Sequence, residues 1–194
     1  MTKAELRRMV LERRAALPEP LRRWYSERIA QWVLQHPWVQ DARAVHLYCS
    51  VRDEVYTELL RQRLLEMGKR VAVPVVRGAQ LLHAWVTLES TYRSGQWGIP
   101  EPEIPDEALQ TAEQLGLTPQ DVVLVPLVGY DRRLFRLGYG RGFYDGFLRS
   151  VPARRIGLAF SVQFVPEIPC EPHDVALDAV VTECGVLYSL DHSA

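Results

Sequence analysis

The feature that most constrains the fold is an unbroken apolar run at residues 122–128, Val-Val-Leu-Val-Pro-Leu-Val. A run of this length suits a strand and is short for a helix. Because polar and apolar side chains do not alternate along it, both of its faces should be buried. Strands of that kind are typical of parallel sheets covered by helices on each side. The run therefore predicts a protein of the α/β class.

Other short apolar runs repeat this pattern and alternate with amphipathic segments. The remaining predicted strands are residues 44–49, 71–76, 81–86, 155–160 and 179–182. Helices are predicted at residues 3–17, 21–35 and 57–67. A strand, a helix and a strand in that order favour parallel pairing, and no linker is long or polar enough to divide the chain. We therefore predict a single three-layer α/β domain over residues 1–194, with a mainly parallel central sheet flanked by helices.

Some local expectations are more specific. In the helix of residues 21–35, Trp24 and Trp32 are expected to join the apolar stripe that faces the core, and Pro37 is expected to end the helix. In the first helix, the basic side chains, Arg14 among them, are expected on a solvated face. Residues 106–115 are expected to hold a short helix, within an otherwise irregular region.

The segment at residues 136–145, Arg-Leu-Gly-Tyr-Gly-Arg-Gly-Phe-Tyr-Asp, is the best candidate for a binding site. Its glycines permit positive φ, and consecutive amides in such a loop can form a nest for an anion. Arg136 and Arg141 carry guanidinium groups that suit phosphate, and Asp145 carries the hard oxygens that Mg²⁺ prefers. The spacing matches neither the P-loop nor the dinucleotide motif. On the residues alone, a glycine-rich surface turn remains the alternative.

Charge and cysteine content limit the class of function. The chain has 23 Lys and Arg against 24 Asp and Glu, a net charge of −1, which argues against a nucleic-acid partner. No apolar run approaches the ~20 residues that span a membrane, and the charged start lacks a signal-peptide core. The three scattered cysteines form neither a disulfide framework nor a zinc motif. We expect a cytoplasmic monomer with no nucleic-acid or membrane partner.

Polar residues beside other predicted strands suggest the chemistry. Ligands of open α/β sheets bind outside the carboxyl ends of the strands, where Glu54 and Asp174 are expected to lie. Together with the glycine loop, these carboxylates favour a metal–nucleotide site and phosphoryl transfer. The sequence has no nucleophile-elbow motif. We interpret Cys49 as a buried structural thiol and His173 as a hydrogen-bonded loop residue.

These residues also carry a resemblance to a known family. Besides residues 136–145, the matching segments are residues 3–7, Glu54 ahead of Thr57, residues 97–102, 125–131 and 171–182. They follow one another in the family's order, and the chain resembles the 5-formyltetrahydrofolate cyclo-ligases, or 5,10-methenyltetrahydrofolate synthetases. The resemblance implies that 5-formyltetrahydrofolate and ATP, with Mg²⁺, give 5,10-methenyltetrahydrofolate, ADP and phosphate. The formyl oxygen attacks the γ-phosphate, and N10 of the folate then closes the ring as phosphate leaves.

The resemblance also implies roles for particular residues. The ATP-binding residues are Lys3, Arg7, Arg136, Leu137, Gly138, Tyr139, Gly140, Arg141, Gly142, Phe143 and Tyr144. The folate-binding residues are Cys49, Glu54, Trp97, Tyr139, Gly140, Arg141, Gly142 and Phe143. The catalytic residues are Arg141 and Tyr144, and the magnesium ligands are Asp145 and Asp174. Glu54 is expected to accept hydrogen bonds from the pterin ring and Trp97 to pack on its face.

Two positions depart from the family pattern. Leu134 stands where the family usually has glycine, two residues before the first arginine of the loop, and Phe143 stands where tyrosine is common. Neither change removes a charge, so we expect activity to be retained. Two other functions remain as alternatives: a phosphosugar isomerase or CoA-transferase-like enzyme, and a non-catalytic folate- or nucleotide-binding relative. Retention of Lys3, Arg7, Arg141 and Asp145 argues against the latter.

Overall fold

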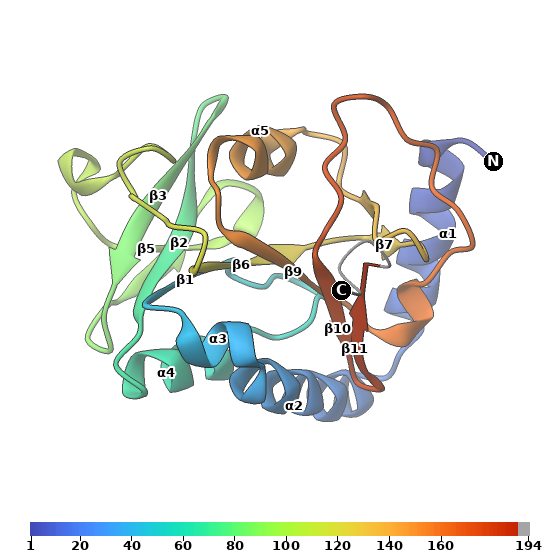
Figure 1. The fold of residues 1–194 in the computed structure, drawn as a ribbon, viewed down its shortest axis with the longest axis horizontal. Coiled ribbons are helices and arrows are strands. Elements are labelled where there is room, and N and C mark those ends of the chain that lie inside the picture. The colour runs from blue at the N-terminus through green and yellow to red at the C-terminus, as the bar shows by residue number, and fades with distance from the viewer. Residues whose placement is uncertain (190–194) are drawn as a thin grey trace.

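The computed structural model describes residues 1–189 and is built on one central sheet. Its strands are β1 (Ala44–Leu47), β2 (Arg70–Arg77), β3 (Gln80–Val86), β6 (Val122–Pro126), β9 (Arg154–Leu158), β10 (Ala179–Thr182) and β11 (Gly185–Tyr188). The seven strands lie in the order β11-β10-β9-β6-β1-β2-β3 (Figure 1). The strands from β10 to β2 pair in parallel, and the two edge strands pair antiparallel with their neighbours.

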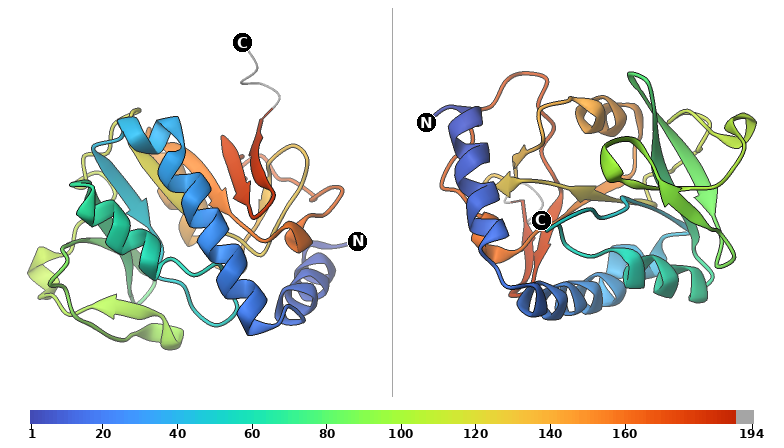
Figure 2. Two further views of the ribbon diagram at one scale, coloured as in Figure 1. Left: turned by 90° about the horizontal axis from the view of Figure 1, so that it is seen from below. Right: turned by 180° about the vertical axis from the view of Figure 1, so that it is seen from behind.

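Helices cover both faces of the sheet, which confirms the predicted three-layer α/β fold. They are α1 (Lys3–Ala15), α2 (Glu19–Gln35), α3 (Pro37–Asp41), α4 (Glu58–Glu66) and α5 (Phe143–Ser150). Figures 1 and 2 show α2, α3 and α4 on one face, α5 on the other, and α1 upright beside β7 (Gly129–Tyr130). Within residues 1–189, none of the helices combines the length and apolarity needed to cross a bilayer.

The short elements include one prediction that was wrong and one that was confirmed. The smaller pieces are β4 (Tyr92–Ser94), β5 (Pro100–Pro102), β8 (Arg136–Leu137) and the 3₁₀ turns η1 (Gln96–Gly98), η2 (Asp106–Ala108) and η3 (Ser161–Gln163). The helix expected at residues 106–115 is only the turn η2, followed by further turns. Pro37 ends α2 but also begins α3, since a proline at the first helical position loses no hydrogen bond.

The core lies in two layers on either side of the central strands. Residues 122–125 of β6 are fully buried, as their uniform hydrophobicity predicts. Val122 and Leu124 pack on the side of α2 and α4, whereas Val123 and Val125 pack with Phe147 of α5. The strand therefore contacts helical layers on both faces, and burial of such apolar surface is the main stabilising term of the fold.

The tryptophans of α2 do not join the core, contrary to the sequence-based expectation. Ile29 and Val33 are fully buried, but Trp24 is 53% and Trp32 40% exposed. Trp24 lies five residues before Ile29, which turns it by about 140° around the helix. The Arg28 guanidinium instead lies 5.5 Å from the Trp24 ring. The true apolar stripe is narrower than the predicted one.

The strand order fixes where a ligand can bind. From β1 the chain crosses to β2 on one side, whereas β6 leads to β9 and β10 on the other. The switch lies between β1 and β6, which pair in parallel from Val45 opposite Val122. At such a point the loops that follow the two strands diverge and leave a crevice. These loops carry Glu54 and the glycine-rich segment.

Candidate active site

The loop after β1 presents Glu54 from a largely enclosed position. The Val51 amide donates to Glu54 Oε2 at 2.9 Å, and the side chain is 6% exposed. Thr57 is the N-cap residue of α4, but its hydroxyl donates to the Tyr48 carbonyl at 2.7 Å and caps no helix amide. Burial raises the pKa of the Glu54 carboxyl. The structure thus places a buried carboxyl group at the switch point.

The turn that precedes the glycine loop is organised by Asp131. This buried carboxylate accepts from the amides of Arg133, Phe135 and Ile168 at 2.9–3.1 Å. Leu134 adopts a φ of 59°, a region that costs an ordinary side chain roughly 1–2 kcal/mol. Its side chain is buried in the core, which offsets that strain. Leu134 therefore adopts a positive φ in this turn while its side chain packs in the core.

Two of the three glycines of the loop are required by its backbone. Gly140 has φ +90° and Gly142 has φ +73°. Gly142 is the N-cap residue of α5 and provides no side-chain cap. The first amides of α5 therefore remain available to an anion at a helix N-terminus. This is the arrangement that the sequence of the loop predicts.

Helix α1 carries two basic residues that contact distant segments of the candidate site. A capping box between Thr2 and Glu5 fixes the start of the helix. One turn apart, the Arg7 Nε donates to the Gly138 carbonyl at 2.7 Å, and Lys3 Nζ lies 2.7 Å from Asp174 Oδ2. The structure therefore brings Arg7 to the glycine loop and Lys3 to Asp174.

Asp145 and Asp174 each already pair with a base. Arg136 lies 2.7 Å from Asp145 Oδ1 and also donates to the Val175 carbonyl at 3.1 Å. Among residues 1–189, no group of three or more His, Cys, Asp or Glu side chains forms a metal site. Mg²⁺ commonly uses only one or two carboxylates and takes its other oxygens from phosphates and water. The two aspartates fit that donor set, but they fit no site made by the protein alone.

Trp97 and Arg141, which belongs to the glycine loop, are in direct contact. Trp97 has φ 59°, and the Arg141 guanidinium carbon lies 3.4 Å from the centre of its ring. Phe143 approaches the same tryptophan with 6.2 Å between ring centres. The hairpin that carries Trp97 is anchored by buried Glu101, which pairs with Arg77 at 3.0 Å. A planar ligand and a cation can therefore be held side by side here.

The two loops are joined by a chain of hydrogen bonds through Tyr139. Its hydroxyl donates to Glu54 Oε1 at 2.6 Å and accepts from Arg14 Nη2 at 3.0 Å. Arg14 is 2% exposed, so the expectation of a solvated face was wrong for this residue. The sequence pattern of α1 gave no signal for its role, because Tyr139 closes over it from 125 residues away.

Two further predicted residues, Cys49 and Tyr144, lie close to Glu54. Cys49 is a buried free thiol whose pKa burial raises to about 11, as expected for a structural cysteine. The Tyr144 hydroxyl is buried and has no hydrogen-bond partner within the described residues. Burial raises its pKa, with the Cys49 and Glu54 charges as secondary causes.

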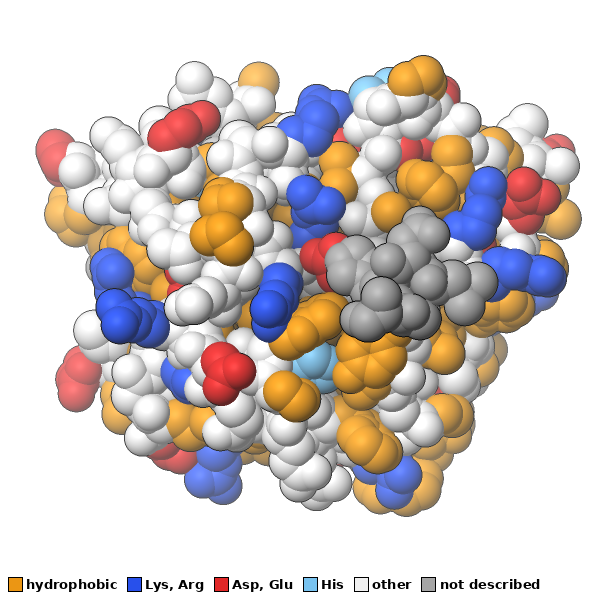
Figure 3. Space-filling model, viewed as in Figure 1, with side chains coloured by type: hydrophobic (Ala, Val, Ile, Leu, Met, Phe, Trp, Pro, Cys, Tyr) orange, Lys and Arg blue, Asp and Glu red, His pale blue; other side chains and the backbone are white. Residues whose placement is uncertain are grey.

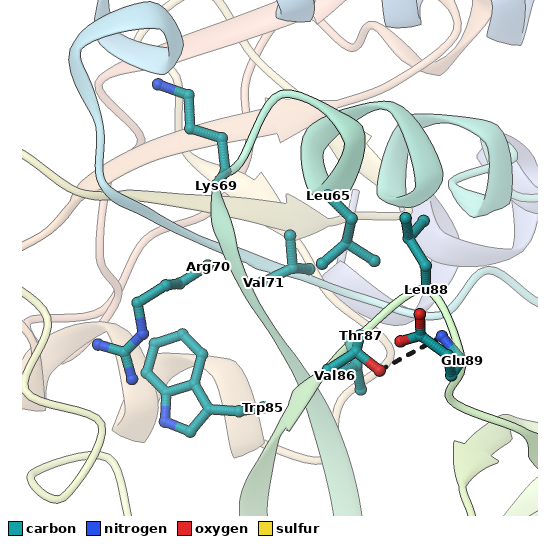
Figure 4. Close-up of a pocket in the computed structure, with 9 residues that line it drawn as sticks. All are labelled: Leu65, Lys69, Arg70, Val71, Trp85, Val86, Thr87, Leu88 and Glu89. Atoms are coloured by element: carbon teal, nitrogen blue, oxygen red, sulfur yellow. Dashed lines mark hydrogen bonds between the residues drawn. The ribbon is translucent and has the colours of Figure 1, made fainter.

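A separate cavity of about 500 Å³ lies away from these groups (Figure 4). It is lined by the start of β2 and the end of β3, and the Arg70 guanidinium lies 3.9 Å from the centre of the Trp85 ring. This is the amino-terminal end of the parallel strands, opposite the end where Glu54 and the glycine loop lie. On the face in Figure 3, acidic and basic side chains are interspersed, without one dominant charge.

Fold and site together define an α/β protein with a glycine-rich loop at the switch point of its sheet. The sequence profile described as the 5-formyltetrahydrofolate cyclo-ligase family matches residues 1–183. The chain belongs to this family of ligase enzymes, which act on small molecules.

Individual relatives agree with this assignment. The chain is 35% identical over 192 residues to 5-formyltetrahydrofolate cyclo-ligase of Mycolicibacterium smegmatis, with 93% of each chain covered. It is 32% identical over 184 residues to that of Escherichia coli K12, covering 92% of this chain and 98% of the other. The solved structure of Aquifex aeolicus 5,10-methenyltetrahydrofolate synthetase superimposes with a TM-score of 0.83 at 31% identity, covering 100% of this chain and 96% of that one. These comparisons support cyclo-ligase activity.

Proposed function

We propose that this chain converts 5-formyltetrahydrofolate and ATP into 5,10-methenyltetrahydrofolate, ADP and phosphate, with Mg²⁺. The formyl oxygen attacks the γ-phosphorus of ATP, and the bond from that phosphorus to the ADP oxygen breaks. N10 then attacks the activated formyl carbon and loses its proton, and phosphate departs with the former formyl oxygen. Turning a poor leaving oxygen into phosphate divides one difficult step into easier ones.

The glycine loop and α1 hold the nucleotide. Lys3 and Arg7 contact the phosphates from α1, and the amides of residues 138–142 together with the start of α5 surround them. Arg141 leaves the face of Trp97 to stabilise charge that develops on the transferred phosphoryl group. Arg136 supports the loop through its bonds to Asp145 and the Val175 carbonyl.

The folate occupies the crevice between Glu54 and Trp97. A carboxylate only accepts hydrogen bonds, so Glu54 suits the N–H groups of a pterin, and the Trp97 ring suits its flat face. Tyr144, whose hydroxyl is buried without a partner within residues 1–189, donates to the reacting formyl group. Cys49 lines the inner wall as an uncharged thiol.

Asp145 and Asp174 are the residues that would hold Mg²⁺ against the phosphates. When bound, the ion supplies positive charge that offsets the charge of the transferred phosphoryl group. The bases now paired with the two carboxylates, Arg136 and Lys3, are also phosphate-binding candidates. Each pair holds a candidate magnesium ligand next to a candidate phosphate-binding base. This closeness supports a shared site for Mg·ATP.

One observation carries the proposal. The hydroxyl of Tyr139, within the nucleotide loop, lies 2.6 Å from Glu54 Oε1 in the folate loop. The two segments assigned to the two substrates are thus in direct contact. A phosphoryl group on one side can therefore reach a formyl oxygen on the other, which is the proximity that the reaction requires.

A direct assay tests the proposal. The purified protein is mixed with 5-formyltetrahydrofolate and Mg·ATP, and methenyl formation is followed by its absorbance near the ultraviolet edge of the visible range. Omission of ATP should abolish the signal, which separates a ligase from an isomerase or CoA-transferase-like enzyme. If the folded protein binds both ligands but forms no product, it is a non-catalytic relative and the proposal is wrong. Monomeric state and cytoplasmic location stay predictions from the sequence.

A further inference from the structure

Arg14 is a buried basic residue that donates both of its hydrogen bonds from a single nitrogen, Nη2. Its Nη2 lies 2.7 Å from Asp53 Oδ1 and 3.0 Å from the Tyr139 hydroxyl. Within the described residues, its buried Nε and Nη1 atoms have no hydrogen-bond partner. Moving a guanidinium out of water costs free energy unless ion pairs and hydrogen bonds in the protein offset the lost hydration. A purely structural ion pair with Asp53 explains one bond of this group, but not its contact with the Tyr139 hydroxyl.

The direction of the hydrogen bonds in this chain is fixed by chemistry. A guanidinium donates and cannot accept, so the Tyr139 hydroxyl must accept from Arg14. The single phenolic proton of Tyr139 is then directed to Glu54 Oε1, 2.6 Å away. Glu54 Oε2 accepts from the Val51 amide. Both oxygens of Glu54 therefore face donors, an arrangement that selects the ionised carboxylate.

We propose that Arg14 is a positioning residue for the folate site, which acts through Tyr139 to hold Glu54 ionised and oriented as a hydrogen-bond acceptor. The inference rests on the proposed function, because it assigns the purpose of this carboxylate to pterin binding. It also couples the two substrate loops, since Tyr139 belongs to the nucleotide loop. Arg14 touches neither substrate.

The charges around Glu54 show why a base is needed. The Asp53 carboxylate lies on the same loop and raises the pKa of Glu54, after the larger effect of burial. Tyr139 and Arg14 lower it. The other titratable groups that face it are the hydroxyls of Tyr48 and Tyr144 and the thiol of Cys49. These three groups are neutral at ordinary pH. The positive charge of Arg14 therefore offsets the negative charges of the Glu54 and Asp53 carboxylates.

The test measures the titration of Glu54 directly. The protein is labelled with ¹³C at glutamate side-chain carboxyls, the Glu54 signal is assigned by its loss in Glu54→Gln, and its pKa is recorded without substrates. Arg14→Met should raise the Glu54 pKa by about one to two units, the effect of removing a charge within ~6 Å at an effective dielectric constant near 20. Arg14→Lys should restore most of the shift. Arg13→Met changes the neighbouring exposed base and should leave the titration unchanged.

Kinetics provide the second reading. In Arg14→Met the acid limb of kcat/KM for 5-formyltetrahydrofolate should move to higher pH with the Glu54 titration, whereas KM for ATP should stay within about twofold. Tyr139→Phe removes the bridge while keeping Arg14, and should also raise the Glu54 pKa. It carries the test if Arg14→Met does not fold.

The outcomes are distinct. An unchanged Glu54 titration in Arg14→Met and Tyr139→Phe overturns the inference, as does a loss of activity whose pH profile equals that of the wild type. The NMR titration needs no turnover. Failure of the cyclisation assay in wild type therefore refutes the proposed function, and failure of the titration refutes only the role of Arg14.

Discussion

The buried pair of His46 on β1 and His83 on β3 should make the fold sensitive to acid. One ring nitrogen donates to the other over 2.9 Å, and Phe147 of α5 packs on both rings with centres 4.6 and 4.3 Å away. Burial lowers the pKa of His83 from 6.5 to about 4, against a smaller opposing effect of Glu113. Burial, then its partner, lowers the pKa of His46 as well.

The sign and size follow from proton linkage. A histidine with a lower pKa in the folded state takes up its proton on unfolding, so acid favours the unfolded chain. The stability due to His83 is complete above pH 6.5 and is lost as the pH falls toward 4. Between about pH 7.5 and about pH 5 this amounts to about 2 kcal/mol from His83 alone. Because α5 packs on the pair, the end of the glycine loop should loosen first.

Urea unfolding at the two pH values measures this effect. His83→Gln cannot titrate, so its loss of stability between them should be smaller than in wild type by about 2 kcal/mol. Any constant cost of the substitution cancels in this comparison. His173→Gln alters an exposed histidine and is the matched control. An equal pH dependence in wild type and His83→Gln would refute the reasoning.

Three further substitutions test the site. Arg141→Ala should lower kcat for cyclisation by roughly 100-fold or more while changing the folate KM far less, because its charge acts on the transition state; equal losses would assign it to binding alone. Asp145→Asn should raise the Mg²⁺ concentration needed for half-maximal rate, and an identical metal titration would reject it as a ligand. Gly140→Ala forces a side chain into φ +90° beside the Arg7 guanidinium and should cost about 1 kcal/mol of stability. It should also raise the KM for ATP, and an unchanged KM would show that the loop adapts.

The composition of short segments predicts most of the fold. Uniform apolar runs indicate the buried strands, because a strand without alternation has no solvated face. Glycine at alternate positions indicates the loop, because Gly140 and Gly142 need positive φ. Proline and tryptophan are harder to interpret: Pro37 both ends one helix and begins another, and Trp24 faces solvent. A proline is compatible with the end or the start of a helix, and a tryptophan is compatible with a buried or an exposed position, so the local sequence does not decide between them.

The candidate site also contains residues that the sequence indicates and one that it does not. Arg136, Arg141 and Asp145 lie within ten residues of one another, so their spacing alone indicates a phosphate-binding segment. The resemblance to the cyclo-ligases supplies Glu54 and Trp97, which no periodicity singles out. Neither the spacing of residues nor the family resemblance identifies Arg14, because the local sequence presents it only as one of several basic residues on a helix.

Local sequence is sufficient to specify which elements form and which loop can bind an anion, since both depend on backbone preferences and on short-range hydrophobic patterning. Which charges become buried, and which partners they meet, depends on tertiary contacts. Tyr139 reaches Glu54 across 85 residues and Arg14 across 125, and its contact with Glu54 joins the loops that follow the parallel strands β6 and β1. Burial changes the energy of a charge by several kcal/mol. That energy depends on segments which close over the charge from elsewhere in the chain, so local sequence does not contain it.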